Sequence, residues 1–71
     1  MNKFRHFVVM YYKTVGSAIQ TGQRRGQYAF NLLSKLYPHI ANEIRGTKYD
    51  PFYQDERLDI FFKHVEELLK E

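Results

Sequence analysis

The sequence predicts an all-α protein, a compact bundle of three main helices plus one short helix, in a single domain spanning residues 1–71. Apolar side chains recur at helical spacing in the first and last thirds of the chain. Gly22, Pro38 and Gly46 stand where helices would end or begin. Twelve of the 71 residues are Phe or Tyr. These aromatic side chains can supply a dense core in a chain that is too short to bury much surface and has no Cys for disulfides.

The first helix is expected over residues 3–20. Asn2 is suited to cap its start and Gly22 to end it. Its apolar stripe consists of Phe4, Phe7, Val8, Tyr11, Tyr12, Val15 and Ile19. Residues 7–12 are also rich in the β-branched and aromatic residues that are typical of strands. They show neither alternation nor a partner strand, so the helix is favoured.

The second helix is expected over residues 23–36. Its main apolar face is made of Ala29, Phe30, Leu33, Leu36 and Tyr37, and Tyr28 and Leu32 widen it. Gly26 lies on the same face, where the missing side chain would let the backbone of another helix approach closely. Pro38 disfavours helical geometry at the residue before it and so ends this helix.

A short third helix is expected over residues 38–45. Pro38 suits its first position, and Gly46 supplies the left-handed residue that closes it. Arg45 would lie favourably at the negative end of the helix dipole. After this helix, Asp50-Pro51 predicts a capped turn, and we expect the aromatic pair Phe52-Tyr53 to plug the core.

The fourth helix, over residues 55–70, has the strongest periodicity in the chain. Asp55 is expected to cap it. Its apolar positions are Leu58, Phe61, Phe62, Val65, Leu68 and Leu69. On its polar face the i,i+4 spacing predicts the ion pairs Asp59–Lys63, Lys63–Glu67 and Glu66–Lys70.

Charge is distributed unevenly along the chain. Residues 1–48 carry eight Lys or Arg side chains against one acidic side chain, a net charge of +7. Residues 49–71 carry three basic side chains against seven acidic ones, a net charge of −4. This asymmetry suits either an anionic partner at the basic end or pairing between the two ends of the folded chain.

Composition and spacing argue against several functional classes. With no Cys, zinc-finger, thiol-nucleophile and redox chemistry are excluded. The longest apolar run, residues 7–12, is far shorter than a membrane span or the core of a signal peptide, so a cytoplasmic protein is expected. The acidic residues near position 55 are explained as helix-start charges. His6, His39 and His64 have no metal-ligand spacing. We therefore expect no catalytic, cofactor-binding or metal site, and no enzymatic activity.

Two kinds of partner are compatible with the remaining features. Arg24, Arg25 and Gln27 open the second helix after a glycine turn, as in the reading end of a helix-turn-helix protein, so a small DNA- or RNA-binding regulator is one hypothesis. The apolar character of the rest of that helix argues against placing it in a groove of DNA. The other hypothesis is a protein partner, because Tyr and Arg are frequent at binding hot spots. A homo-oligomer formed through residues 3–20 would use the same aromatic side chains.

The middle of the chain resembles a known type of small phage protein. The pattern is Arg25-Gly26-Gln27-x-x-Phe30-Asn31-x-Leu33, then Pro38-x-x-Ala41-x-x-Ile44-Arg45-Gly46-Thr47, then Asp50-Pro51-Phe52-x-x-Asp55 and an aromatic helix. It is similar to a recurrent family of small uncharacterised phage and prophage proteins, and residues 1–20 lie outside it. The resemblance implies an accessory protein that binds and alters a host protein in the host cytoplasm. It transfers no functional residues.

The motif residues have two interpretations. In the first they form a structural latch: Gly26 permits close packing, the amides of Gln27 and Asn31 clamp residues 44–50, and Arg45 pairs with Asp50 or Asp55. In the second they form an exposed recognition patch. The residues predicted to contact a partner are Arg24, Arg25, Gln27, Arg45, Tyr11, Tyr12, Tyr49 and Tyr53.

Overall fold

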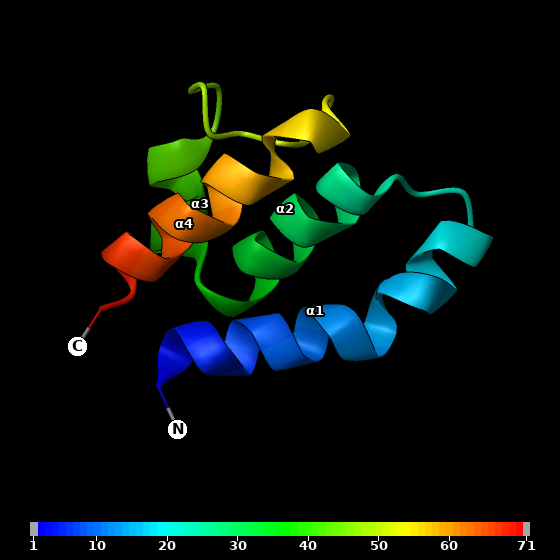
Figure 1. Ribbon diagram of the computed structural model, residues 1–71, viewed down its shortest axis with the longest axis horizontal. Coiled ribbons are helices and arrows are strands. Elements are labelled where there is room, and N and C mark those ends of the chain that lie inside the picture. The colour runs from blue at the N-terminus through cyan, green and yellow to red at the C-terminus, as the bar shows by residue number, and fades with distance from the viewer. Residues whose placement is uncertain (1, 71) are drawn as a thin grey trace.

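The computed structural model describes residues 2–70 and confirms the all-α prediction. Its elements are α1 (Lys3–Gln20), α2 (Arg25–Leu36), α3 (Pro38–Ile44), a single 3₁₀ turn η1 (Asp55–Arg57) and α4 (Leu58–Leu68). Figure 1 shows α2 between α1 on one side and α3 with α4 on the other. The start of α1 and the end of α4 lie on the same side of the molecule.

Local signals set the helix ends much as expected. The backbone N–H of Arg5 donates to Asn2 Oδ1 at 2.7 Å, which caps α1. Gly22 and Gly46 have φ of +97° and +77°, the left-handed conformation that glycine adopts without strain. Pro38 occupies the first position of α3. The second helix begins two residues later than predicted, at Arg25.

The core is aromatic where α1 meets α4. Phe7 and Phe61 are fully buried, with ring centroids 6.1 Å apart in an edge-to-face arrangement. Phe62 lies beside them, 5.8 Å from Phe7 and 5.2 Å from Tyr11. The rest of the buried cluster comes mainly from α2 and α3 and consists of Ala29, Phe30, Leu32, Leu33, Ala41, Ile44, Val65 and Leu69. The core is thus shared by all four α-helices.

The predicted ion pairs of the fourth helix are not formed. Within residues 2–70 the structure contains one salt bridge, in which Lys70 Nζ lies 3.4 Å from Glu67 Oε1 and both side chains are exposed. Exposed pairs of this kind contribute a few tenths of a kcal/mol to stability. Which of the possible pairs form therefore has little effect on the fold.

Candidate functional site

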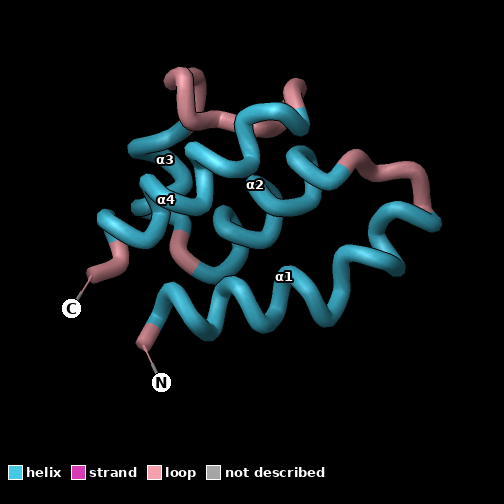
Figure 2. Tube along the Cα trace, in the orientation of Figure 1, coloured by secondary structure: helices cyan, strands magenta, loops and turns pink. Residues whose placement is uncertain are grey.

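The connection between α3 and η1, residues 46–54, is ordered by a carboxylate of its own and by arginines from η1 and from the residue that precedes α2. We call it the latch loop; it is the pink segment between these two elements in Figure 2. Asp50 organises its interior: Oδ2 accepts from the N–H of Gly46 at 2.8 Å and Oδ1 from the N–H of Phe52 at 2.9 Å. One carboxylate therefore holds both ends of the turn, as expected for an Asx-type turn.

Arg57 holds the same loop from η1. Its Nη1 donates to the carbonyl of Thr47 at 3.2 Å and to that of Asp50 at 3.4 Å. Arg57 was not among the predicted site residues, because its two acceptors are backbone carbonyls of the loop, which have no signature in the sequence. Together with Asp50, it makes the latch loop an ordered surface.

The role of Asp55 differs from the prediction. It does not cap the helix that follows it; η1 begins after Gln54 with no capping side chain. Instead, Asp55 Oδ1 accepts from the backbone N–H of Gly26 at 2.9 Å, 29 residues away. A carboxylate at this position neutralises the positive end of the α2 dipole and satisfies one of its free N–H groups. The start of α2 is therefore completed by a distant part of the chain.

Gly26 is the contact point between α2 and the latch loop. A Cβ atom built there would lie 2.1 Å from the carbonyl oxygen of Pro51 and 3.0 Å from Asp55 Oδ1. Since the first of these is a backbone atom, no rotamer change can relieve the clash. The close packing predicted for this glycine is confirmed, although the backbone that approaches it belongs to the latch loop and not to another helix. Asp50 and Asp55 hold this region through backbone N–H groups and not through the predicted pairing with Arg45.

Replacing Asp55 by Ala should destabilise the protein by about 1 kcal/mol through the lost helix cap. The Gly26 amide is the specific reporter: its hydrogen exchange should accelerate in Asp55→Ala more than that of amides in α4. Glu56→Ala, an exposed neighbour in the same turn, is the control and should leave the Gly26 amide unchanged. Equal protection of Gly26 in both variants would contradict the cap.

Other parts of the predicted latch are wrong. Gln27 does not reach residues 44–50; its Oε1 accepts from the backbone N–H of Arg24 at 3.5 Å. Asn31 donates to Gln23 Oε1 at 3.4 Å. Arg45 makes no ion pair within residues 2–70; its guanidinium lies 5.1 Å from the centre of the Phe30 ring, a cation–π contact.

Three of the predicted partner-contacting residues gather around the latch loop. Arg24 Nη2 donates to the carbonyl of Phe52 at 3.1 Å, which places Arg24 next to Tyr53. The centroid of the Phe52 ring lies 4.8 Å from that of the Tyr53 ring and 6.2 Å from that of the Phe30 ring. Arg45 covers the Phe30 ring, so both arginines are linked to the same aromatic cluster, Arg24 through the Phe52 carbonyl and Arg45 through Phe30. We call Arg24, Arg45 and Tyr53 the Arg–Tyr surface.

Tyr53 is the most exposed large hydrophobic side chain of the Arg–Tyr surface. The sequence predicted that Phe52 and Tyr53 would both plug the core. Phe52 does pack against the core, but 78% of Tyr53 is exposed. The turn set by Asp50 directs only the first of the two rings inward. The second ring stands outside on a loop whose backbone is held at several points.

The other predicted partner-contacting residues lie outside the Arg–Tyr surface. Tyr11 is in the core, 4% exposed, and burial is the main cause that raises its pKa, with a smaller effect of Tyr12 in the same direction. Tyr12 is 70% exposed on α1. Tyr49 is half-buried and stacks on His64 with ring centroids 3.9 Å apart. Arg25 is exposed near Tyr11, where its charge opposes the rise in that pKa.

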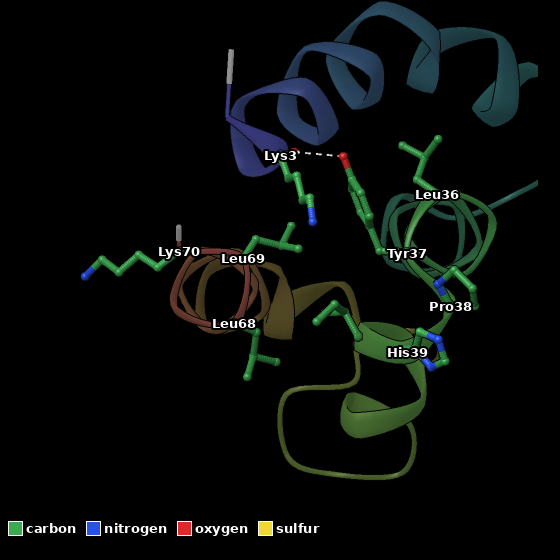
Figure 3. A pocket seen from close by; sticks show the side chains of 9 residues that line it. Lys3, Leu36, Tyr37, Pro38, His39, Leu68, Leu69 and Lys70 are labelled. Carbon is green, nitrogen blue, oxygen red and sulfur yellow. Dashed lines mark hydrogen bonds between the residues drawn. The ribbon is translucent and has the colours of Figure 1, made fainter.

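A mainly apolar hollow between α1, α4 and the α2–α3 junction brings no reactive pair together. It has a volume of about 320 Å³ and lies between the start of α1, the α2–α3 junction and the end of α4. Figure 3 shows Lys70 and His39 pointing away from Lys3, while the Tyr37 hydroxyl donates to the Lys3 carbonyl at 3.3 Å. The polar groups around this hollow are therefore separated or already bonded to backbone.

Residues 2–70 offer neither a cluster of metal ligands nor a membrane-spanning helix. Among residues 2–70 there is no group of three or more His, Asp or Glu side chains arranged to hold a metal ion. No helix in this range combines the length and apolar character needed to cross a membrane.

The Arg–Tyr surface and the latch loop are thus the candidate functional features of this protein. Comparison of the chain with protein-family models, with curated proteins and with solved structures gives no significant match.

Proposed function

We propose that this protein acts by binding another protein through the Arg–Tyr surface, without catalysis. The observation that carries the proposal is the exposure of Tyr53, 78%, on a loop whose backbone is fixed by hydrogen bonds. A large aromatic ring held in water by an ordered loop contributes little to folding. Its contribution to binding is large, because it gains apolar burial when a partner covers it.

The rigidity of the latch loop favours affinity. Binding normally costs about 0.5–1.5 kcal/mol for each side chain or loop segment that it immobilises. Asp50 and Arg57 have already ordered the backbone that carries Tyr53, so most of this cost is met during folding. Tyr and Arg are also the residue types that most often dominate protein interfaces.

The chemistry of the surface indicates the kind of partner. Arg24 and Arg45 are exposed on either side of the aromatic rings. A complementary surface would offer a pocket for the Tyr53 phenol with carboxylates at its rim. The resemblance of the motif to small phage proteins supports a setting in which the partner is a host protein in the host cytoplasm and the protein modulates or inhibits it.

The alternative, a DNA- or RNA-binding regulator, has less support. In a recognition helix the first turn must be free to enter a groove. Here the first turn of α2 is covered by the latch loop, with Asp55 bonded to Gly26 and Gln27 bonded to the backbone of Arg24. The carboxylate of Asp55 also occupies the place that a phosphate would take at this helix end.

Tyr53→Ala should weaken binding to the protein partner by about 2 kcal/mol or more, which is roughly 30-fold. The measurement is capture of partner from host-cell lysate by the immobilised protein, followed by titration of the identified partner. Lys35→Ala, which removes an exposed charge from the opposite end of α2, is the control and should bind as the wild type does.

Nuclease treatment of the lysate separates the two hypotheses. Capture that survives nuclease, falls with Tyr53→Ala and depends weakly on salt supports a protein partner. Capture that disappears with nuclease, falls steeply with salt and requires Arg24 and Arg25 would contradict the proposal and identify a nucleic-acid partner.

A further inference from the structure

A groove with an apolar floor runs between α1 and α4, on a surface that the proposed function does not use. At one end Phe4, Val8 and Tyr12 of α1 face Asp59, Phe62 and Lys63 of α4 around a hollow of about 420 Å³. At the other end Phe4 is shared with a second hollow, of about 240 Å³, lined by Glu66, Leu69 and Lys70. The two hollows adjoin at Phe4, and together we call them the α1–α4 groove.

The α4 side of this groove carries a regular row of charges. Asp59, Lys63, Glu66 and Lys70 are spaced four, three and four residues apart, so they lie along one edge of the helix and of the turn that follows it. We call them the charged edge. Their signs alternate along it: negative, positive, negative, positive.

This order of charges is self-complementary when the helix is reversed. If two copies of α4 lie antiparallel with their midpoints, between residues 63 and 66, on a two-fold axis, Asp59 of each copy faces Lys70 of the other. In the same arrangement Lys63 of each copy faces Glu66 of the other. All four contacts are then between opposite charges, because each of these two pairs occurs twice by symmetry, as an isologous interface requires.

The charges of this edge are available for such contacts. Within residues 2–70, Asp59, Lys63 and Glu66 form no ion pair, although the i,i+4 spacing would allow them to pair along the helix. Lys70 contacts Glu67 at 3.4 Å with both side chains about two-thirds exposed. An exposed pair of this kind is weak and can be exchanged for another at little cost.

The α1 side of the groove supplies the apolar part of the contact. Tyr12 is 70% exposed, and Phe4 and Val8 are half-buried. The aliphatic stems of Lys63 and Lys70 from a second α4 can cover these side chains while their amines reach the opposing carboxylates. The α1 and α4 helices of both copies would then form an antiparallel four-helix arrangement, a common solution for helices with short connections.

We propose that the α1–α4 groove is the docking site for a second copy of this chain, which joins through antiparallel contact of the two charged edges. The resulting dimer is two-fold symmetric and leaves the Arg–Tyr surface free in both copies. It adds apolar burial to a chain whose small size limits the core that it can build alone.

Charge variants of the edge test the proposal directly. The wild type should show a mass that rises with concentration from 8.6 kDa towards twice that value in sedimentation or light-scattering measurements. The all-basic variant (Asp59→Lys with Glu66→Lys) and the all-acidic variant (Lys63→Glu with Lys70→Glu) should each associate at least about tenfold more weakly. An equimolar mixture of these two variants should associate again, because every contact across the axis is then between opposite charges.

A sign-inverted variant is the matched control. Reversing all four charges (Asp59→Lys, Lys63→Glu, Glu66→Lys, Lys70→Glu) keeps the net charge and the alternation, so this variant should dimerise with itself as the wild type does. Far-ultraviolet circular dichroism verifies that each variant keeps its helices. Tyr53→Ala should not change the mass, which keeps this test independent of the proposed function.

Three results would overturn the proposal. One is a wild-type mass that stays at 8.6 kDa up to about 1 mM; the groove would then serve a helix of another protein or none. Another is undiminished self-association of the all-basic or all-acidic variant. The third is failure of their mixture to associate when the wild type does.

Discussion

Replacing Gly26 by Ala should destabilise the protein by about 1–3 kcal/mol, a large share of the stability of so small a domain. The added Cβ would lie 2.1 Å from the Pro51 carbonyl oxygen. Pro51 cannot withdraw easily, because its neighbour Asp50 holds both ends of the latch loop. Either the α2–loop contact opens and the bond from Gly26 to Asp55 is lost, or the backbone is strained. Urea denaturation followed by circular dichroism measures the loss.

Gly16→Ala is the matched control for this prediction. Gly16 lies inside α1, is exposed, and has no atom within 4 Å of where its Cβ would stand. The same substitution there should stabilise the protein by about 0.5–1 kcal/mol, because alanine is the better helix former. Opposite signs at the two positions are therefore expected. Equal effects would mean that the contact with Pro51 is not what requires glycine at position 26.

Replacing Phe61 by Ala should cost about 3–5 kcal/mol and leave the chain largely unfolded at room temperature. Phe61 is fully buried and lies against Phe7 of α1 and Phe62 of α4, at 6.1 and 5.4 Å between ring centroids. Removing its ring leaves a cavity at the junction of α1 with α4, where few backbone contacts can compensate. The measurements are the urea midpoint and the near-ultraviolet signal of the aromatic side chains.

Ile60, the residue before Phe61, provides the control for this prediction. Ile60 is 42% exposed on the outer side of α4, and Ile60→Ala should change stability by no more than about 0.5 kcal/mol. A similar loss in both variants would show that helix propensity, rather than the aromatic core, decides the stability of α4. If the Phe61→Ala variant unfolded only in part, with α2 and α3 still folded, this result would contradict a core shared by all helices.

Local signals in the sequence were sufficient for the helices themselves. The bounds of α1 match the prediction, because Asn2 caps one end and Gly22 adopts a left-handed conformation at the other. Pro38 separates α2 from α3 as expected. Each of these signals acts on residues within one turn of itself, so a pattern read along the chain contains the information needed.

Partners that are distant in the sequence were predicted poorly. Asp55 was expected to cap its own helix, but it caps α2 across 29 residues. Arg45 was expected to pair with a carboxylate and instead covers Phe30. In both cases the side chain has several suitable partners, and the packing of the latch loop, not the residue type, selects one of them.

The candidate surface shows the same contrast between residue types, which the sequence gives, and distant contacts, which it does not. The sequence singled out arginines and tyrosines by type, and this set included Arg24, Arg45 and Tyr53. It could not tell that Arg24 and Arg45 contact Phe52 and Phe30, which adjoin Tyr53 and each other, or that Tyr11 belongs to the core while Tyr53 does not. The exposure of Tyr53 depends on the turn at Asp50, which turns the Phe52 ring inward and leaves the next ring in water.

The bond between Gly26 and Asp55 also has a consequence for synthesis of the protein. When the first 50 residues have emerged from the ribosome, the start of α2 still lacks its carboxylate, and Phe7 still lacks the α4 rings that cover it. The nascent chain therefore cannot complete the start of α2 or the aromatic part of its core early. We expect the polypeptide to remain dynamic until almost all of it has been translated, and then to fold in one cooperative step.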